Sequence, residues 1–206
     1  MLVKLYTSFL RRIAILIILT ANATFALDSY IVKDEFINIE YLHTKIDEIG
    51  SELYAKSGIS LYLLAVKSTN GTPLVKYEIE ISKNLKIPFV LLSMTLDEKK
   101  IDILVSPEVD KAFDRDQVLS PYPWSGTVVP ILTSKIKGDP TDKYASALLN
   151  GYADIADQIA DYHDIELKSS IGNANKNTIN FFRVIFYSII FFALSYYIYR
   201  RFIKNV

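Results

Sequence analysis

The chain has 206 residues, with 23 acidic and 23 basic side chains, two histidines and no cysteine. Without cysteine there is no disulfide framework, so the folded part must be held by its hydrophobic core alone. Every acidic residue lies between Asp28 and Glu166, and the part of the chain outside the two ends has 16 basic residues against 23 acidic ones, a net charge of −7. This acidic balance argues against nucleic acid and anionic lipid headgroups as ligands of the folded part.

Residues 1–26 have the pattern of a secretory signal peptide. Basic residues precede an apolar run over 13–19, and small residues follow over 21–26. This order predicts export and cleavage near residue 26. The alternative is an uncleaved N-terminal anchor, although the apolar run is short for a membrane span.

The next part, residues 27–168, is predicted to form one domain. Apolar residues recur every three or four positions from Ile39 to Tyr54, which predicts an amphipathic helix ending at Gly58. Further along the chain, apolar runs and turn residues predict a strand over 59–66, a helix over 73–84, a strand over 87–96, a strand over 101–106 and a helix over 141–162.

The order of these elements predicts the fold class. The helix between the first two strands favours a parallel pair with a right-handed crossover. The short polar turn "DEKK" at 97–100 makes the next two strands a hairpin. The sequence therefore predicts a small α/β sandwich of helices packed on a mixed sheet.

From Ile37 to Tyr162 the chain resembles the TPM domain, a membrane-associated extracytoplasmic module. The resemblance lies in the strands "SGISLYLLAV" and "KIDILVS", the charged turn "DEKK" and the late helix "GDPTDKYASALLNGYADIADQI". Relatives also commonly carry a leader and a C-terminal membrane helix. This chain departs from them in having "SPEV" at 106–109 where the family has a glycine-rich turn, and it lacks the glycine-rich tail of some relatives.

The resemblance implies a class of function. TPM-domain proteins include assembly factors for a photosynthetic membrane complex and auxiliary subunits of a ligand-gated channel. Some have been described as acid phosphatases, and some bind calcium through aspartates. The implied role is a periplasmic accessory factor that assembles, stabilises or chaperones a larger membrane complex, with a flagellar stator unit or a respiratory oxidase as candidate clients. A metal-dependent acid phosphatase and a calcium-binding module are the alternatives.

One acidic cluster, in "VDKAFDRDQV", is a candidate metal site. Asp110, Asp114 and Asp116 supply the hard oxygen ligands that Ca²⁺ prefers, although the glycine and the distant glutamate of an EF-hand loop are missing. The alternative is a charged surface segment with an N-cap aspartate. Arg115 could neutralise the pair or point away from it.

Neither His43 nor His163 belongs to a catalytic motif, and no catalytic residue is assigned. The single tryptophan, Trp124, favours a packing role, with a partner anchor as the alternative because tryptophan is enriched at interface hot spots.

Residues 169–180 are polar and small and predict a tether, and residues 181–199 carry a single charge, Arg183, and predict a transmembrane helix. The basic tail at 200–206 predicts a cytoplasmic C-terminus, hence a single-pass protein of the bacterial inner membrane with its domain in the periplasm. A buried core helix is the alternative for 181–199. Four residues of this segment are candidates for packing against a membrane partner, as against a simple anchor: Tyr187, Ser188, Ser195 and Tyr196.

Overall fold

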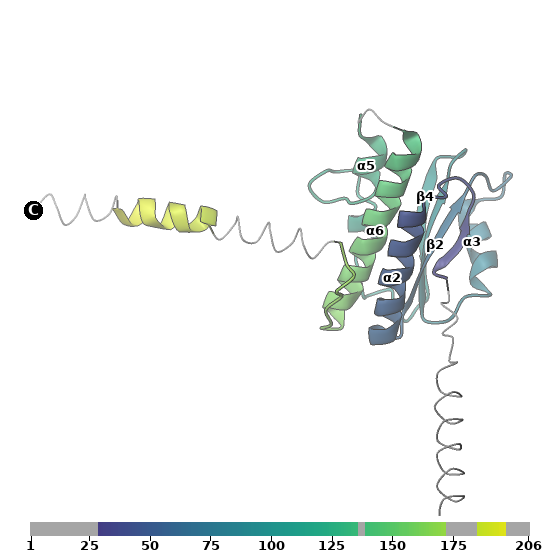
Figure 1. Cartoon of the computed structure of the whole chain (residues 1–206), viewed down its shortest axis with the longest axis horizontal. Coiled ribbons are helices and arrows are strands. Elements are labelled where there is room, and N and C mark those ends of the chain that lie inside the picture. The colour runs from purple at the N-terminus through teal and green to yellow at the C-terminus, as the bar shows by residue number, and fades with distance from the viewer. Residues whose placement is uncertain (1–28, 136–138, 172–184, 197–206) are drawn as a thin grey trace, which may run out of the picture.

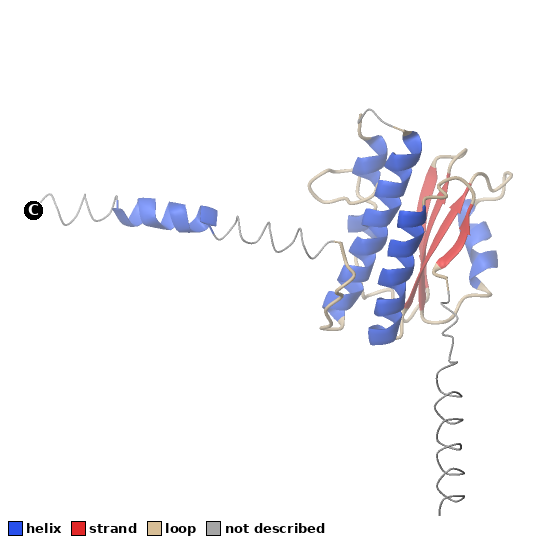
Figure 2. Cartoon of the chain, in the orientation of Figure 1, coloured by secondary structure: helices blue, strands red, loops and turns tan. Residues whose placement is uncertain are grey.

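A computed structural model describes residues 29–135, 139–171 and 185–196 of the chain. Residues 29–171 form three layers, with α2 (Glu40–Ser57) and α6 (Pro140–Tyr162) on one face of a sheet and α3 (Leu74–Ser82) on the other (Figures 1 and 2). Both faces of the sheet are therefore covered by helices. This explains why its two central strands are buried along their whole length rather than at alternate residues.

The sheet has the strand order β1-β2-β3-β4. The pairs β1–β2 and β2–β3 are parallel and the pair β3–β4 is antiparallel. The strands are β1 (Ile31–Asp34), β2 (Ser60–Val66), β3 (Phe89–Thr95) and β4 (Lys100–Val105). The predicted mixed sheet, its parallel pair joined through a helix and its hairpin are confirmed.

The first strand was not predicted. β1 has four residues, and the charged side chains of Lys33 and Asp34 make up half of it. So short a segment has neither the apolar run nor the alternation that identifies a strand. It forms because the open edge of β2 offers backbone partners, as in the bond from the Leu63 N–H to the Tyr30 carbonyl at 2.8 Å.

Side chains from α2 and α6 take the place of strand pairing where β1 begins to pair with β2. The Leu61 carbonyl points to the same side of β2 as Leu63, but there it accepts a bond from the Tyr152 hydroxyl of α6 at 2.6 Å. The Tyr30 N–H donates to the Asp47 carboxylate of α2 at 2.8 Å. The Tyr30 N–H just before β1 and the Leu61 carbonyl of β2 are thus satisfied by α2 and α6, as buried polar groups must be.

The two long helices approach each other closely at Gly50. A Cβ atom there would lie 2.5 Å from the Tyr152 hydroxyl oxygen and 2.5 Å from a ring carbon of Tyr30. Gly50 therefore makes room for the hydroxyl group that caps the sheet. The end of α2 is as predicted, because Gly58 adopts the left-handed conformation with φ of 75° and its N–H bonds to the Tyr54 carbonyl.

Between β4 and α6, where the sequence analysis assigned no helix or strand, the structure has two short helices, α4 (Arg115–Val118) and α5 (Val129–Thr133). α6 begins one residue before the predicted start, with Asp139 as its N-cap, and ends at Tyr162 as expected. Beyond it, the backbone N–H groups of Lys168 and Ser169 donate to the Glu52 carboxylate of α2 at 2.9 and 2.7 Å. The last residue of the predicted domain, Lys168, and the first residue of the predicted tether, Ser169, are thus both bound to α2.

Residues 185–196 are helical, and they lie inside the predicted transmembrane segment 181–199. Within the ranges that the structure describes, no helix has the length and apolar character needed to cross a membrane. The remaining residues of that segment, the predicted signal peptide 1–26 and the predicted cytoplasmic tail 200–206 lie outside the described residues.

The Tyr152 hydroxyl provides a test of how the sheet is capped. Tyr152→Phe keeps the ring but leaves the buried Leu61 carbonyl without its partner. We expect a loss of about 1–3 kcal/mol in the free energy of unfolding, measured by urea denaturation. Tyr162→Phe, on the exposed end of the same helix, is the matched control and should change it little. Equal stabilities for the two variants would contradict this role.

Candidate functional site at the edge of the sheet

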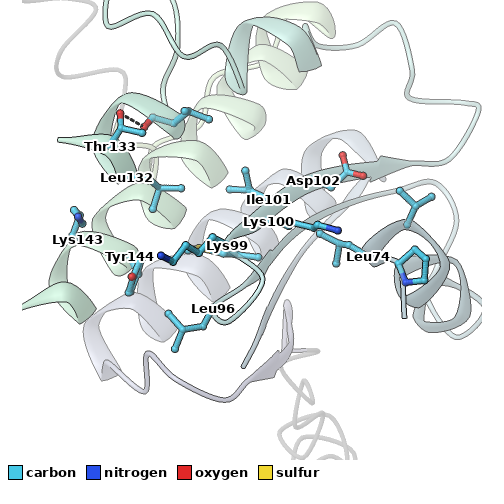
Figure 3. Close-up of a pocket in the computed structure, with 14 residues that line it drawn as sticks. Leu74, Leu96, Lys99, Lys100, Ile101, Asp102, Leu132, Thr133, Lys143 and Tyr144 are labelled. Atoms are coloured by element: carbon cyan, nitrogen blue, oxygen red, sulfur yellow. Dashed lines mark hydrogen bonds between the residues drawn. The ribbon is translucent and has the colours of Figure 1, made fainter. Parts of the chain in front are cut away.

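A groove of about 750 Å³ opens along the edge strand β4 (Figure 3). One wall is the start of α3, with Leu74, and the other comes from α5 and the start of α6, with Leu132 and Tyr144. Between the walls lie β4 and the turn before it. Residues of both helix layers line the groove together with β4, so the edge strand lies between two walls. We call this groove the β4 trough.

The β4 trough is apolar with a cationic rim. Leu96, Ile101 and Leu132 contribute apolar surface, and three lysines, Lys99, Lys100 and Lys143, also line it. In Figure 3 the lysine amines lie around the opening, with Lys99 on the side of Tyr144 and Lys100 on the side of Leu74.

Among the described residues that line the trough, Asp102 is the only acid, and its charge is neutralised. Its carboxylate pairs with the Arg115 guanidinium of α4. It also accepts a bond from the Ile103 N–H of its own strand at 2.8 Å. The trough is therefore locally positive on a domain that is acidic as a whole.

A buried carboxyl group lies beneath α3, next to this trough. Glu78 is completely buried against β3 and β4, where its neighbours are Ser93 and Asp102. Ser93 and Asp102 are partners across the β3–β4 pair, so they lie on the same face of the sheet. Neither oxygen of the Glu78 carboxyl has a hydrogen bond of good geometry to any described residue.

Burial raises the pKa of Glu78 from 4.5 to about 7. The nearby Asp102 carboxylate acts in the same direction, whereas the Ser93 hydroxyl and the Arg115 guanidinium oppose it. Sequence reasoning missed this group. The available signal was a polar residue inside each of two otherwise apolar strands, Ser93 in "FVLLSMT" and Asp102 in "KIDILV".

The three aspartates of the predicted metal site line an open hollow of about 590 Å³ together with Lys111 and Arg115. Asp110 lies in a turn and Asp116 in the first turn of α4, and both are exposed. Asp114 is the N-cap of α4 and accepts from the Gln117 N–H at 2.9 Å. Among the residues that the structure describes, no three His, Asp or Glu side chains are arranged to hold a metal ion.

The geometry of the aspartate segment favours the surface-helix alternative in one respect, since Asp114 is indeed an N-cap. Asp110 and Asp114 do not share a helical face, because residue 110 precedes the helix. Arg115 points toward Asp102 at the sheet edge rather than neutralising its neighbours. The calcium site at Asp110, Asp114 and Asp116 stays a prediction from sequence spacing.

Trp124 lies on the surface instead of packing in the core. Its side chain is 82 % exposed and stacks on Tyr122, with ring centroids 5.1 Å apart. The packing role predicted for it is wrong, because the loop "SPYPWSG" projects both rings away from the domain. The two rings form a flat apolar surface, which we call the aromatic ledge.

Hydrogen bonds hold the loop under the aromatic ledge. The Gly126 N–H donates to the Tyr122 carbonyl at 2.7 Å, and the Ser120 and Ser125 hydroxyls are 2.7 Å apart. A Cβ atom at Gly126 would lie 1.8 Å from the Ser120 carbonyl oxygen, so only glycine allows this close backbone approach. The ledge is therefore presented in one defined conformation.

The two histidines have structural surroundings. His43 Nε2 lies 2.7 Å from the Asp34 carboxylate, which also accepts from the Ile37 and Asn38 N–H groups and so shapes the turn after β1. His163 is the C-cap residue of α6.

The predicted membrane-partner residues lie on the helix at 185–196. Tyr187, Ser195 and Tyr196 are exposed, and Ser188 is half-buried. The large apolar side chains of this helix are exposed throughout, including Phe191 and Phe192.

The raised pKa of Glu78 predicts how stability changes with pH. Because the folded state binds this proton more tightly than the unfolded state, the free energy of unfolding falls as pH rises from 4.5 to about 7. The full effect of this one group is about 3 kcal/mol. In Glu78→Gln that part of the pH dependence should disappear, as measured by urea denaturation across this window. Glu80→Gln, exposed on the same helix, should retain it. An unchanged pH profile in Glu78→Gln would contradict the assignment.

Comparisons with known proteins find little that is similar. No family model matches the chain, and no curated protein matches it. Three chains of solved structures match. One is the NMR structure of the BA42 protein from the psychrophilic bacterium Bizionia argentinensis, which is 14% identical over 66% of this chain and 94% of that chain, with a TM-score of 0.38.

Proposed function

We propose that the chain is a bacterial inner-membrane accessory protein. A TPM-like domain in the periplasm, carried by a single C-terminal membrane helix, would bind subunits of a larger membrane protein complex and assemble or stabilise it. The proposal combines the sequence resemblance to the TPM domain with the surface of residues 29–171.

The observation that carries the proposal is the aromatic ledge. A tryptophan that is 82 % exposed leaves a large apolar surface in water, which a monomeric protein has no folding reason to do. Tyr122 stacks on it, and Gly126 and the serine pair hold the loop, so binding would order few groups. Preorganised aromatic side chains are the typical anchors of protein interfaces because they bury much area at low entropic cost.

Membrane attachment is supported by the sequence of both ends. A leader-like segment precedes the domain, and the segment 181–199 is apolar and is followed by Arg200 and Arg201. Within it, helical residues 185–196 expose apolar side chains on every face, as a helix in contact with lipid or with another membrane helix would.

The client complex is not specified by these features, and a flagellar stator unit and a respiratory oxidase are both consistent with them. The two alternatives, a metal-dependent acid phosphatase and a calcium-binding module, have no supporting geometry among the residues described.

Replacing Trp124 tests the partner-binding role. Purification of the full chain from detergent-solubilised membranes of its own cells should recover one stoichiometric integral-membrane partner. Trp124→Ala should reduce that recovery by about tenfold or more, the usual cost of removing an interface anchor.

The matched control is Tyr41→Ala, another exposed aromatic side chain, 62% exposed, on α2. It should leave the recovery unchanged. Recovery of the protein alone, or equal loss in both variants, would contradict a role for the ledge.

Truncation tests the attachment. A chain that stops after Asn180 keeps the whole domain but lacks the apolar segment and the basic tail. We expect it in the soluble periplasmic fraction, while the full chain resists extraction from the membrane by alkaline carbonate. A truncated chain that still sediments with membranes would contradict anchoring by this segment.

A further inference from the structure

We propose that the β4 trough binds an extended acidic segment of the partner, which adds to the sheet as a fifth strand beside β4. The inference rests on the proposed partner-binding function and identifies a second contact, separate from the aromatic ledge. The bound segment would be an extended chain in which apolar side chains alternate with carboxylates.

The outer edge of β4 has backbone groups available for pairing. In the antiparallel pair with β3, the Ser106 N–H donates inward to the Phe89 carbonyl, so Ile103, three residues earlier, points outward, and its N–H donates to the Asp102 side chain. Inward and outward groups alternate along an antiparallel strand, so Ile101 also points outward. No described strand pairs with this edge, since β4 is last in the strand order.

The trough has the shape that an added strand needs. The start of α3 forms one wall and α5 with the start of α6 forms the other, so a fifth strand would be covered on both faces (Figure 3). Leu132 and Ile101 provide apolar surface for side chains that point to one face, and Leu74 does so for the other. Added strands are recognised in this way, by main-chain hydrogen bonds and by pockets for alternate side chains.

Charge complementarity defines the occupant. Lys99, Lys100 and Lys143 line the trough, and none of them forms an ion pair with a described residue. The only lining acid, Asp102, is already paired with Arg115. Carboxylates on the added segment would meet three uncompensated ammonium groups, whereas the rest of this acidic domain would repel them. Pairing with the trough of a second copy would instead bring two sets of three lysines together, which like-charge repulsion disfavours.

The exposed edge also explains the position of Asp102. Its carboxylate occupies the outward N–H of Ile103, and its pairing with Arg115 holds it there. The Ile103 N–H, near the middle of β4, is therefore not available to another strand. This limits nonspecific pairing of β4 with the strand edges of other molecules. The half of β4 nearer the turn, from Lys100 to Asp102, faces the trough and would be the part that accepts the added segment.

The test uses the full chain in detergent micelles and a fluorescent peptide of about eight residues, the length of a typical strand, that alternates isoleucine with glutamate. We expect saturable binding by fluorescence anisotropy, weakened by added salt. A peptide with lysine in place of glutamate should bind about tenfold more weakly or not at all.

Two variants locate the site. Ile101→Pro removes an outward N–H while leaving the bonds between β3 and β4, and it should weaken binding about tenfold, whereas Ile101→Val should not. The double variant Lys99→Glu, Lys143→Glu should weaken binding at least as much. Its control is Lys111→Glu, which should not weaken binding because Lys111 is exposed and lies outside the trough. Thermal unfolding checks that each variant folds, and the lysine variants test the proposal independently if Ile101→Pro does not fold.

Three results would overturn the proposal. The first is the absence of saturable binding of the acidic peptide. The second is that Ile101→Pro and the Lys99→Glu, Lys143→Glu double variant bind the peptide as tightly as the unaltered chain. The third is self-association of the chain that Ile101→Pro abolishes, because a second copy would then occupy the trough. The purification from membranes separates this proposal from the previous one. If Trp124→Ala loses the partner and Ile101→Pro retains it at full strength, the partner-binding function stands and the strand addition fails.

Discussion

The fold depends on one hydrogen bond between its last helix and its central strand. The Tyr152 hydroxyl of α6 donates to the Leu61 carbonyl of β2, a group that an ordinary sheet would pair with β1. The bond lies in a fully buried environment, so losing it would leave a polar group without water or partner. Its geometry requires that α6 lies against α2 at Gly50, where any side chain would collide with the hydroxyl. The position of α6, and with it the wall of the β4 trough, follows from this contact.

The two faces of the sheet are built on different physical principles. The face under α2 and α6 is an apolar core in which the buried Tyr152 hydroxyl and the Leu61 carbonyl bond to each other. The face under α3 contains Glu78, buried without a good hydrogen bond beside Ser93 and Asp102. Such a carboxyl group is tolerated because it holds a proton up to near-neutral pH, when a charged group would be costly to bury. The same Asp102 reaches the outer edge of β4 and pairs with Arg115, so the buried polar cluster and the trough share a residue.

Much of the fold could be predicted because its signals are local. The apolar period of α2, its end at Gly58 and the largely apolar runs of β2 and β3 each appear within a few neighbouring residues. β1 could not be predicted, since its strand conformation comes from the open edge of β2 rather than from its own four residues. The site was predicted least well. For Trp124 a packing role was favoured over a partner anchor, and its exposure follows from the loop that the close approach at Gly126 shapes. The trough lysines come from segments more than forty residues apart, and no local pattern relates them.

The sequence by itself determined the class of fold, the acidic character of the domain and the apolar segment near the C-terminus, because composition and periodicity are properties of neighbouring residues. Only the tertiary structure decided which polar groups meet. It placed Asp114 as the N-cap of α4, set Glu78 against Ser93 and Asp102, and brought α3 and α6 to opposite sides of β4. The reason is physical: a site requires several side chains at one point in space, and that convergence is set by packing between elements distant in the chain.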